Sequence, residues 1–412
     1  MTLDFSGQNL RGRSFKGRKD LIGANFSYAD IRGADFTNAL LQEANFSQAQ
    51  AGRERGWAIV LLGVSLLLSA LSGLASAFVG VTTGTALTRQ DPIEILAGVV
   101  VLITLAVFMI VSIRQGLAIA FAVLVAVGVT TAAVLAAAGS GAVVASAVTA
   151  AAGALAIAIV AAAAAIGAGA GAAVVVAGAA AAAAGMSVAM NASGTTALAG
   201  SVAAGVAVAV AMAAAGLSAS ISWKALAGDK NYTFIHRLAI IFAAIGGTSF
   251  RGADLTDADF TQATLESTNF IRANLTRTCW FQAKKLSFAR VERTYLENEQ
   301  VRLLVVTGEG QKQNFDNLSL RGTNLRGANL VEASFVATDL SEANLQSANL
   351  SKAKLMQTHL DGADLTGARL VGAYIEDWGI TNETKFDKVQ YEYVFRRLGK
   401  KRRPRPEPPP SI

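Results

Sequence analysis

Residues 326–350 read RGANLVEASFVATDLSEANLQSANL, and Leu or Phe recurs in this stretch at every fifth position. A small residue, most often Ala, stands two positions before each of these centres, and Asn or Asp often stands directly before it. A period of five fits neither an α-helix nor a flat strand. It fits a chain that turns a corner at every unit, because short polar side chains that bond their own backbone favour corners. The centre and the small residue of each unit then face a common core.

The same period recurs in three blocks, which cover residues 1–50, 248–296 and 314–376. In each block, phenylalanines lie twenty residues apart, as Phe315 and Phe335 do. This spacing indicates four units in each turn of the chain, so that such rings stack on one another. The centres expected to fill the core are Phe26, Phe36, Phe46, Phe250, Leu255, Phe260, Leu265, Phe270, Leu275, Phe315, Leu330, Phe335, Leu345, Leu350 and Leu365.

Two stretches carry a resemblance to a known family. RGADLTDADFTQATL (251–265) and the stretch 326–350 resemble the pentapeptide repeat family, whose consensus is Ala, then Asp or Asn, then Leu and two variable residues. The resemblance implies a right-handed quadrilateral β-helix, a solenoid whose successive coils lie about 4.8 Å apart. The chain as a whole resembles the membrane-anchored members of this family that are common in cyanobacteria.

Residues 57–223 have a different composition, dominated by Ala, Val, Leu, Ile and Gly. No charged residue or histidine occurs from Gln115 through Trp223. A membrane span needs about 20 apolar residues. The sequence therefore predicts an α-helical transmembrane bundle beside the solenoid, with six spans, or four longer ones as the alternative. The six expected spans are 57–80, 95–113, 117–138, 142–166, 172–190 and 197–221.

Positive residues flank the apolar region. Arg53 and Arg55 precede it, and Lys224, Lys230 and Arg237 follow it. Such residues favour the cytoplasmic side of a membrane. We therefore expect an integral, multi-pass protein of the plasma or thylakoid membrane, with both chain ends in the cytoplasm.

Four further segments carry separate expectations. Residues 231–246 are too short to span a bilayer and are expected to form an interfacial helix. Residues 297–313 interrupt the repeat, which predicts a helical insertion, and residues 377–395 carry the aromatic side chains of a C-terminal cap. Residues 396–412 form a basic, Pro-rich tail with the composition of a disordered segment. This tail is expected to contact anionic lipids through Arg396, Arg397, Lys400, Lys401, Arg402, Arg403 and Arg405. The alternatives are a positive charge bias of the cytoplasmic side without lipid binding, and binding of the tail to a protein.

The N-terminal block makes about two coils, which is thin for an independent solenoid. Its alternation of Phe with Leu or Ile continues from Phe250 to Leu275. We therefore hypothesise that the N-terminal coils stack on the second block, as one solenoid that residues 57–223 interrupt.

Residues that could carry chemistry have simpler explanations in this sequence. His236 and His359 flank no acidic or metal-binding pattern, and Cys279 is explained as a small buried residue at a coil corner. Motifs that bind phosphate or a dinucleotide do not occur. The sequence therefore predicts a protein that is not an enzyme and has no catalytic residue, metal site or cofactor. Three acidic residues recur with the repeat itself, namely Asp254, Asp257 and Asp259.

The net charge of the second and third repeat blocks indicates which classes of partner the protein could bind. Residues 248–375 hold fourteen basic and fourteen acidic side chains. Their zero net charge offers no phosphate-binding stripe, so a nucleic acid partner is not expected. It also argues against the role of some pentapeptide proteins that mimic DNA and bind gyrase through a strongly acidic surface.

Together these features predict a membrane-tethered scaffold that faces the cytoplasm and binds an unidentified protein partner, with membrane lipids and further copies of the chain as other contacts. One alternative is a membrane component for the export or localisation of lipids or glycolipids. Another is a channel or pore, lined by a polar helix face that packing between helices also explains. That face consists of Ser65, Ser69, Ser72 and Ser76.

Overall fold

The structure is a computed structural model that describes residues 2–54, 92–115 and 233–395, with isolated helical positions between 57 and 224. The chain divides into two units. One consists of residues 1–54 and 246–412, and the other of residues 55–245. The two are described separately below.

Each corner of the solenoid is the same four-residue turn. In the unit centred on Phe26, the N–H of Ala29 donates to the Phe26 carbonyl at 3.1 Å. Tyr28, the third residue of the turn, has a φ of 59°, as a type II turn requires at this position. The Asn25 side chain accepts from the N–H of Ser27 at 3.1 Å. Where an Asn or Asp precedes a centre, its side chain can therefore stabilise the corner that follows.

Successive coils pair as parallel strands. Asn25 bridges Asn45, twenty residues later. The N–H of Phe26 donates to the Asn45 carbonyl at 2.7 Å, and the N–H of Asn45 donates to the Ala24 carbonyl at 2.9 Å. The same pair of bonds recurs along the solenoid, so a coil of four units is its repeating element.

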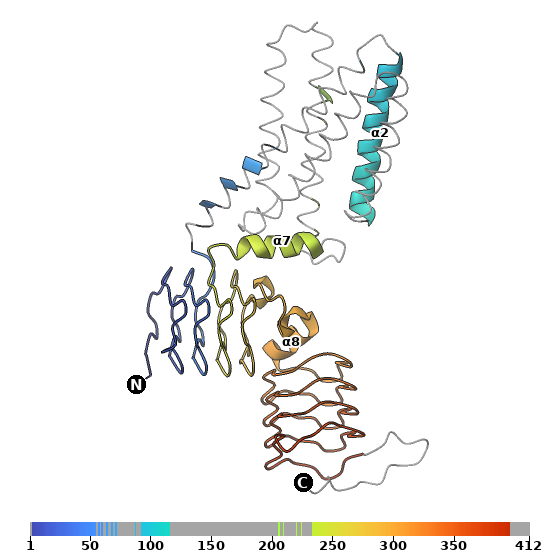
Figure 1. Cartoon of the computed structure of the whole chain (residues 1–412). Helices are drawn as coiled ribbons and strands as arrows, with labels where there is room; N and C mark the ends of the chain where they lie inside the picture. The colour runs from blue at the N-terminus through green and yellow to red at the C-terminus, as the bar shows by residue number, and fades with distance from the viewer. Residues whose placement is uncertain are drawn as a thin grey trace, which may run out of the picture. The chain divides into compact units, whose positions relative to one another are not determined.

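The first two repeat blocks form one continuous ladder. Asp35 bridges Ser249, and Leu40 bridges Asp254, across more than two hundred residues of sequence. Figure 1 shows the coils of the N-terminal block stacked directly on those that begin near residue 248. The structure thus contains the single interrupted solenoid that the hypothesis requires.

Aromatic side chains fill the first part of the solenoid in two columns. Stacked neighbours have ring centroids 4.8 to 5.2 Å apart, and rings of opposite columns meet edge to face. One column contains Phe5, Phe26, Phe46, Phe260 and Trp280, and the other contains Phe15, Phe36, Phe250 and Phe270.

Phenylalanines twenty residues apart do stack, as Phe315 and Phe335 also show with a centroid distance of 5.2 Å. All fifteen centres expected in the core are buried, and the largest exposed fraction among them is 5%, at Leu275.

The ladder breaks after the coil that begins near Cys279. Two 3-10 turns, η2 (Leu286–Phe288) and η3 (Tyr295–Glu297), are followed by helix α8 (Glu299–Thr307). Asn298 begins α8, because its side chain accepts from the N–H groups of Gln300 and Val301. Gly308 ends the helix in a left-handed conformation with a φ of 72°.

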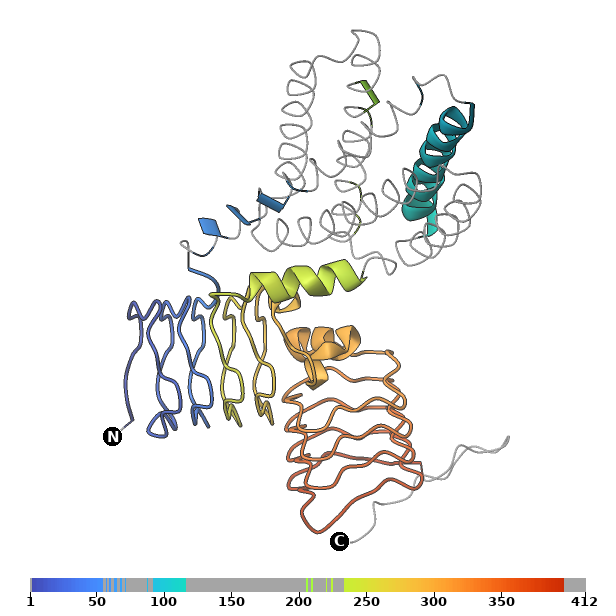
Figure 2. The same ribbon diagram turned by 45° about the horizontal axis from the view of Figure 1, so that its top comes forward.

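Repeats resume after α8 and continue to residue 395. Gly310 stands where a repeat centre would carry Leu or Phe, because α8 fills that space. A Cβ at Gly310 would lie 2.8 Å from Leu330 and 3.0 Å from Leu304, a buried residue of α8. Figures 1 and 2 both show α8 beside the coils that follow it.

The segment 377–395, expected as a cap, continues the ladder. Tyr374 bridges Phe395, and Arg369 bridges Gln390. Trp378 packs against Phe386 with ring centroids 5.7 Å apart. Residues 396–412, and with them all seven basic residues expected to contact lipid, lie outside the described residues.

The second unit contains helix α2 (Pro92–Gln115), and helix α7 (Thr233–Ala243) lies where an interfacial helix was expected. Within the described residues, no helix is long and apolar enough to cross a membrane. This finding contradicts the predicted transmembrane bundle and the predicted integral, multi-pass localisation with cytoplasmic ends. The physical reason is that an apolar segment is expected to be buried, but its composition does not determine whether protein or lipid surrounds it. Most of the six expected spans lie outside the described residues.

Candidate binding clefts at the solenoid junction

The break in the ladder leaves a strand edge unpaired. One coil earlier, the N–H of Asn274 donates to the Ala253 carbonyl at 2.9 Å, and the N–H of Leu255 donates to the Asn274 carbonyl at 2.9 Å. At the break, the corresponding groups are the Ala273 carbonyl and the Leu275 N–H. Neither has a hydrogen-bond partner among the residues that the structure describes.

The solenoid parts before and after α8 are joined at one corner. The N–H of Arg277 donates to the Gly322 carbonyl at 2.6 Å, and the side-chain amide of Asn324 donates to the Arg277 carbonyl at 2.9 Å. Nearby, the N–H of Gln282 donates to the carbonyl of Val306, at the end of α8, at 2.7 Å. We call this region the junction. Clefts open on two sides of it.

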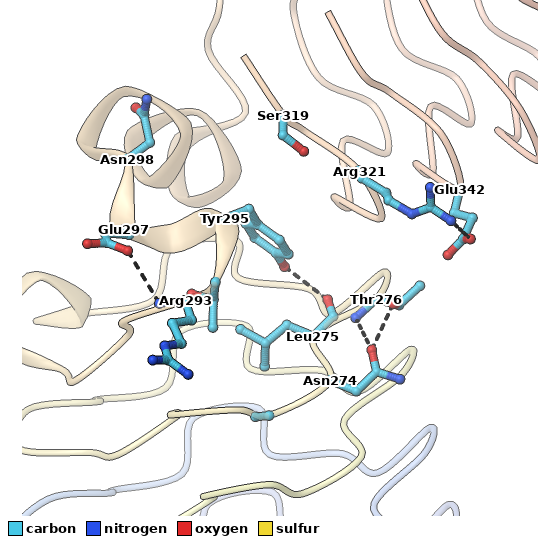
Figure 3. Close-up of a pocket in the computed structure, with 12 residues that line it drawn as sticks. Asn274, Leu275, Thr276, Arg293, Tyr295, Glu297, Asn298, Ser319, Arg321 and Glu342 are labelled. Carbon is cyan, nitrogen blue, oxygen red and sulfur yellow. Dashed lines mark hydrogen bonds and ion pairs between the residues drawn. The ribbon is translucent and has the colours of Figure 1, made fainter.

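The first cleft has a volume of about 690 Å³. Its walls come from both parts of the solenoid, with Asn274 to Thr276 on one side and Ser319 with Arg321 on the other (Figure 3). Arg321 forms an ion pair with Glu342 at 2.5 Å. The charged residues that line this cleft are two arginines and two glutamates, Arg293, Arg321, Glu297 and Glu342.

Tyr295 fixes one end of the first cleft. Its hydroxyl donates to the Leu275 carbonyl at 3.0 Å and accepts from the indole N–H of Trp280 at 2.8 Å (Figure 3 shows the first of these bonds). Burial raises the pKa of Tyr295 well above its ordinary value. The hydroxyl therefore stays protonated at neutral pH and keeps both bonds.

Replacing Tyr295 by phenylalanine is expected to lower the free energy of unfolding by about 1–3 kcal/mol, because it leaves the Trp280 indole N–H and the Leu275 carbonyl without this partner. Urea unfolding followed by circular dichroism measures the loss. The control is Tyr391→Phe at an exposed tyrosine, which should change stability by less than about 0.5 kcal/mol. Equal effects of the two substitutions would contradict the role given to the Tyr295 hydroxyl.

The second cleft, with a volume of about 610 Å³, includes Cys279, Phe281, Val305, Asn324 and Arg326 in its lining. Burial raises the pKa of the Cys279 thiol. A protonated thiol is a poor nucleophile. Cys279 was expected to be buried, but it is only partly buried and lines this cleft.

Of the three acidic residues singled out by sequence, Asp257 and Asp259 line the second cleft. Asp254 and Asp259 accept from the N–H and hydroxyl groups of Thr256 and Thr261, two residues after each of them. Asp257 instead forms an ion pair with Arg277 at 2.6 Å. Each of the three carboxylates thus stabilises a turn or a contact between neighbouring coils of the solenoid.

The two histidines lie in different elements. His359 bridges Asp339 and Gly379 within the ladder, and His236 lies in α7, with its side chain outside the described residues. Across the described parts of the chain, no group of three or more His, Cys, Asp or Glu residues is placed to hold a metal ion.

The clefts were not predicted from the sequence. One signal was present, namely a glycine at the centre position 310. It lies where the repeats resume after α8.

Comparison with known proteins gives the following matches. Residues 20–51, 245–279, 314–346 and 338–377 match the family described as pentapeptide repeats, in eight copies. No curated protein gives a significant match.

Two solved structures illustrate the structural matches. HetL, a pentapeptide repeat protein involved in heterocyst differentiation regulation from Nostoc sp. strain PCC 7120, is 22% identical over 36% of this chain and 61% of its own, with a TM-score of 0.17. Rfr23 from Cyanothece 51142 is 30% identical over 20% of this chain and 60% of its own, with a TM-score of 0.13. The chain thus spans about three-fifths of each of these two proteins.

Proposed function

The chain carries repeats of the pentapeptide repeat family, and from that premise we propose that it is a non-catalytic scaffold that binds a protein partner at the junction. Rigid solenoids present extended surfaces to partners. The clefts of the junction are the part of the described surface where two pieces of solenoid converge on a shared space.

The observation that carries this proposal is the contrast between the regular coils and the junction. Along the coils, the backbone groups of one strand pair with the next coil, as the N–H of Asn45 does with the Ala24 carbonyl and the N–H of Asn349 with the Ala328 carbonyl, each at 2.9 Å. At the junction, backbone groups of the strand edge are unpaired within the described structure. A partner can therefore form hydrogen bonds with these backbone groups.

The two alternatives, lipid or glycolipid export and a pore, both depend on membrane-spanning helices. No specific observation in the described residues favours either. The scaffold proposal depends on the solenoid alone.

The test is affinity purification with the full-length chain, followed by reciprocal purification with each recovered protein and measurement of binding with purified components. Arg321→Glu removes the ion pair with Glu342 and sets two like charges at the wall of the first cleft. It should weaken binding about tenfold or more, as at central interface positions. The matched control is Arg369→Glu, the same charge change at an exposed position of a distant coil.

A partner that survives reciprocal purification and loses affinity only for Arg321→Glu supports the proposal. Failure to recover any reciprocal partner, or equal binding by both variants, would contradict binding at the junction.

A further inference from the structure

We propose that the first cleft receives an extended, uncharged peptide segment of a protein partner, which adds a strand between the two parts of the solenoid. This inference rests on the proposed scaffold function and specifies its binding mode. Strand addition to an exposed sheet edge is an established way of binding peptides, in which main-chain hydrogen bonds supply the affinity.

The first wall of the cleft presents a complete set of bonding groups for one residue of such a strand. Within the ladder, the Ala253 carbonyl and the Leu255 N–H together hold Asn274 through its N–H and carbonyl. The Ala273 carbonyl and the Leu275 N–H are the same two groups, one coil further on. Both are without a partner among the described residues, so they can hold one residue of an added strand in the same way.

The opposite wall presents the complementary set. Ser319 lies in the strand that pairs with Asp339, but those bonds use the Leu318 carbonyl, at 3.0 Å, and the Leu320 N–H, at 2.7 Å. The N–H and carbonyl of Ser319 itself have no partner in the described structure. Ser319 is exposed and lines the cleft (Figure 3). A strand lying about 4.8 Å from each wall, the spacing of paired strands, would bond to both, with alternate residues facing Leu275 and Ser319.

The charges of the cleft specify an uncharged segment. Arg321 forms an ion pair with Glu342. Glu297 accepts from the backbone N–H of Arg293 at 3.3 Å, a bond that does not involve the charged guanidinium group. The two arginines and two glutamates that line the cleft sum to zero, so neither an anionic nor a cationic ligand gains from entering it. The volume of about 690 Å³ falls in the range that takes a ligand of several residues or a drug-sized molecule.

The probe is a phage-displayed library of heptapeptides, selected on the full-length chain, with the selected sequences then synthesised. Ser319→Pro removes an N–H that makes no hydrogen bond in the described structure. It should weaken binding of the selected peptides about tenfold. Ser14→Pro is the matched control: Ser14 is also exposed, holds the same repeat position and has an N–H without a partner in the described part of the chain. It should leave binding unchanged.

A second measurement does not depend on how the proline variant folds. Neighbouring N–H groups of a strand point to opposite sides. Two analogues of each selected peptide, N-methylated on the odd or on the even residues, therefore each lose the bonds to one wall. Both analogues should lose binding, and amide exchange at Leu275 and Ser319 should slow when the unmodified peptide binds.

Any one of four outcomes would overturn the inference. The first is that no selected peptide binds, and the second is that N-methylation on both sets of residues leaves binding intact. The third is self-association of the chain that competes with the peptides, which would assign the cleft to a second copy. The fourth is that the purified partner binds the wild type and Ser319→Pro equally well, in which case the scaffold function stands and strand addition alone fails.

Discussion

Phe250→Ala is expected to lower the free energy of unfolding of the solenoid by about 3–5 kcal/mol, the usual cost of removing a fully buried aromatic ring. Phe250 is 0% exposed and stacks between Phe36 at 4.9 Å and Phe270 at 5.2 Å. Phe46 and Phe260 meet its edge at 5.3 and 5.5 Å. Its ring therefore joins the coils before the interruption to those after it.

The measurement is urea unfolding followed by circular dichroism, together with amide hydrogen exchange. In a repeat array each coil contacts only its neighbours. Exchange should therefore accelerate in residues 4–50 and 249–274, while residues 329–369 change little. Phe5→Ala is the control, because Phe5 is only partly buried and stacks on one neighbour, Phe26. If Phe5→Ala lowers the free energy of unfolding as much as Phe250→Ala does, the aromatic column across the interruption contributes no more to stability than the end of the solenoid.

The solenoid core could be predicted from sequence because a single spacing determines it. Once a corner occurs every five residues, the centre of each unit must face inward, and Phe315 must lie over Phe335. The Asn or Asp before each centre adds a local signal, since it bonds the turn that follows. The five-residue spacing of the centres and the turn-forming residues beside them indicate the same structure at nearly every unit, so the fold can be predicted from the sequence.

The junction could not be predicted in the same way, because it depends on contacts between distant residues. Gly310 shows that a repeat centre is missing, but only the structure shows that Leu304 takes its place. The unpaired Leu275 N–H follows from where α8 lies, and no residue type records it. The C-terminal segment was expected to form a cap because of its aromatic residues, among them Trp378 and Phe395, and in the structure the ladder continues through it.

The transmembrane prediction was wrong for a different reason. Hydropathy describes the preference of a segment for a nonaqueous medium. The Ala-rich runs of residues 115–223 have the apolar composition that gives this preference. Alanine, however, is also the residue with the highest helix propensity and packs closely in protein interiors. An Ala-rich composition therefore does not distinguish a helix in a lipid bilayer from a helix in a protein interior.

Gly52→Ala is expected to destabilise the solenoid by about 3 kcal/mol or more, from backbone strain and from a steric clash. Gly52 has a φ of 141°, and a Cβ there would lie 2.9 Å from the carbonyl oxygen of Glu266. Because the obstacle is backbone, no change of side-chain rotamer relieves the clash. The N–H of Gly52 donates to the Thr248 hydroxyl at 2.9 Å, and its carbonyl accepts from the Thr248 N–H at 2.9 Å.

These bonds close the coil where the chain leaves and re-enters it. The buried Thr248 hydroxyl also donates to the Ile31 carbonyl at 2.8 Å, so a shift of Gly52 separates two coils at once. Gly327→Ala is the control, since Gly327 has a φ of 67° and open space where a Cβ would go. It should cost about 1 kcal/mol, the strain of a left-handed residue alone. Urea unfolding of the two variants gives the difference, and equal losses would show that closure at Gly52 does not hold the interrupted solenoid together.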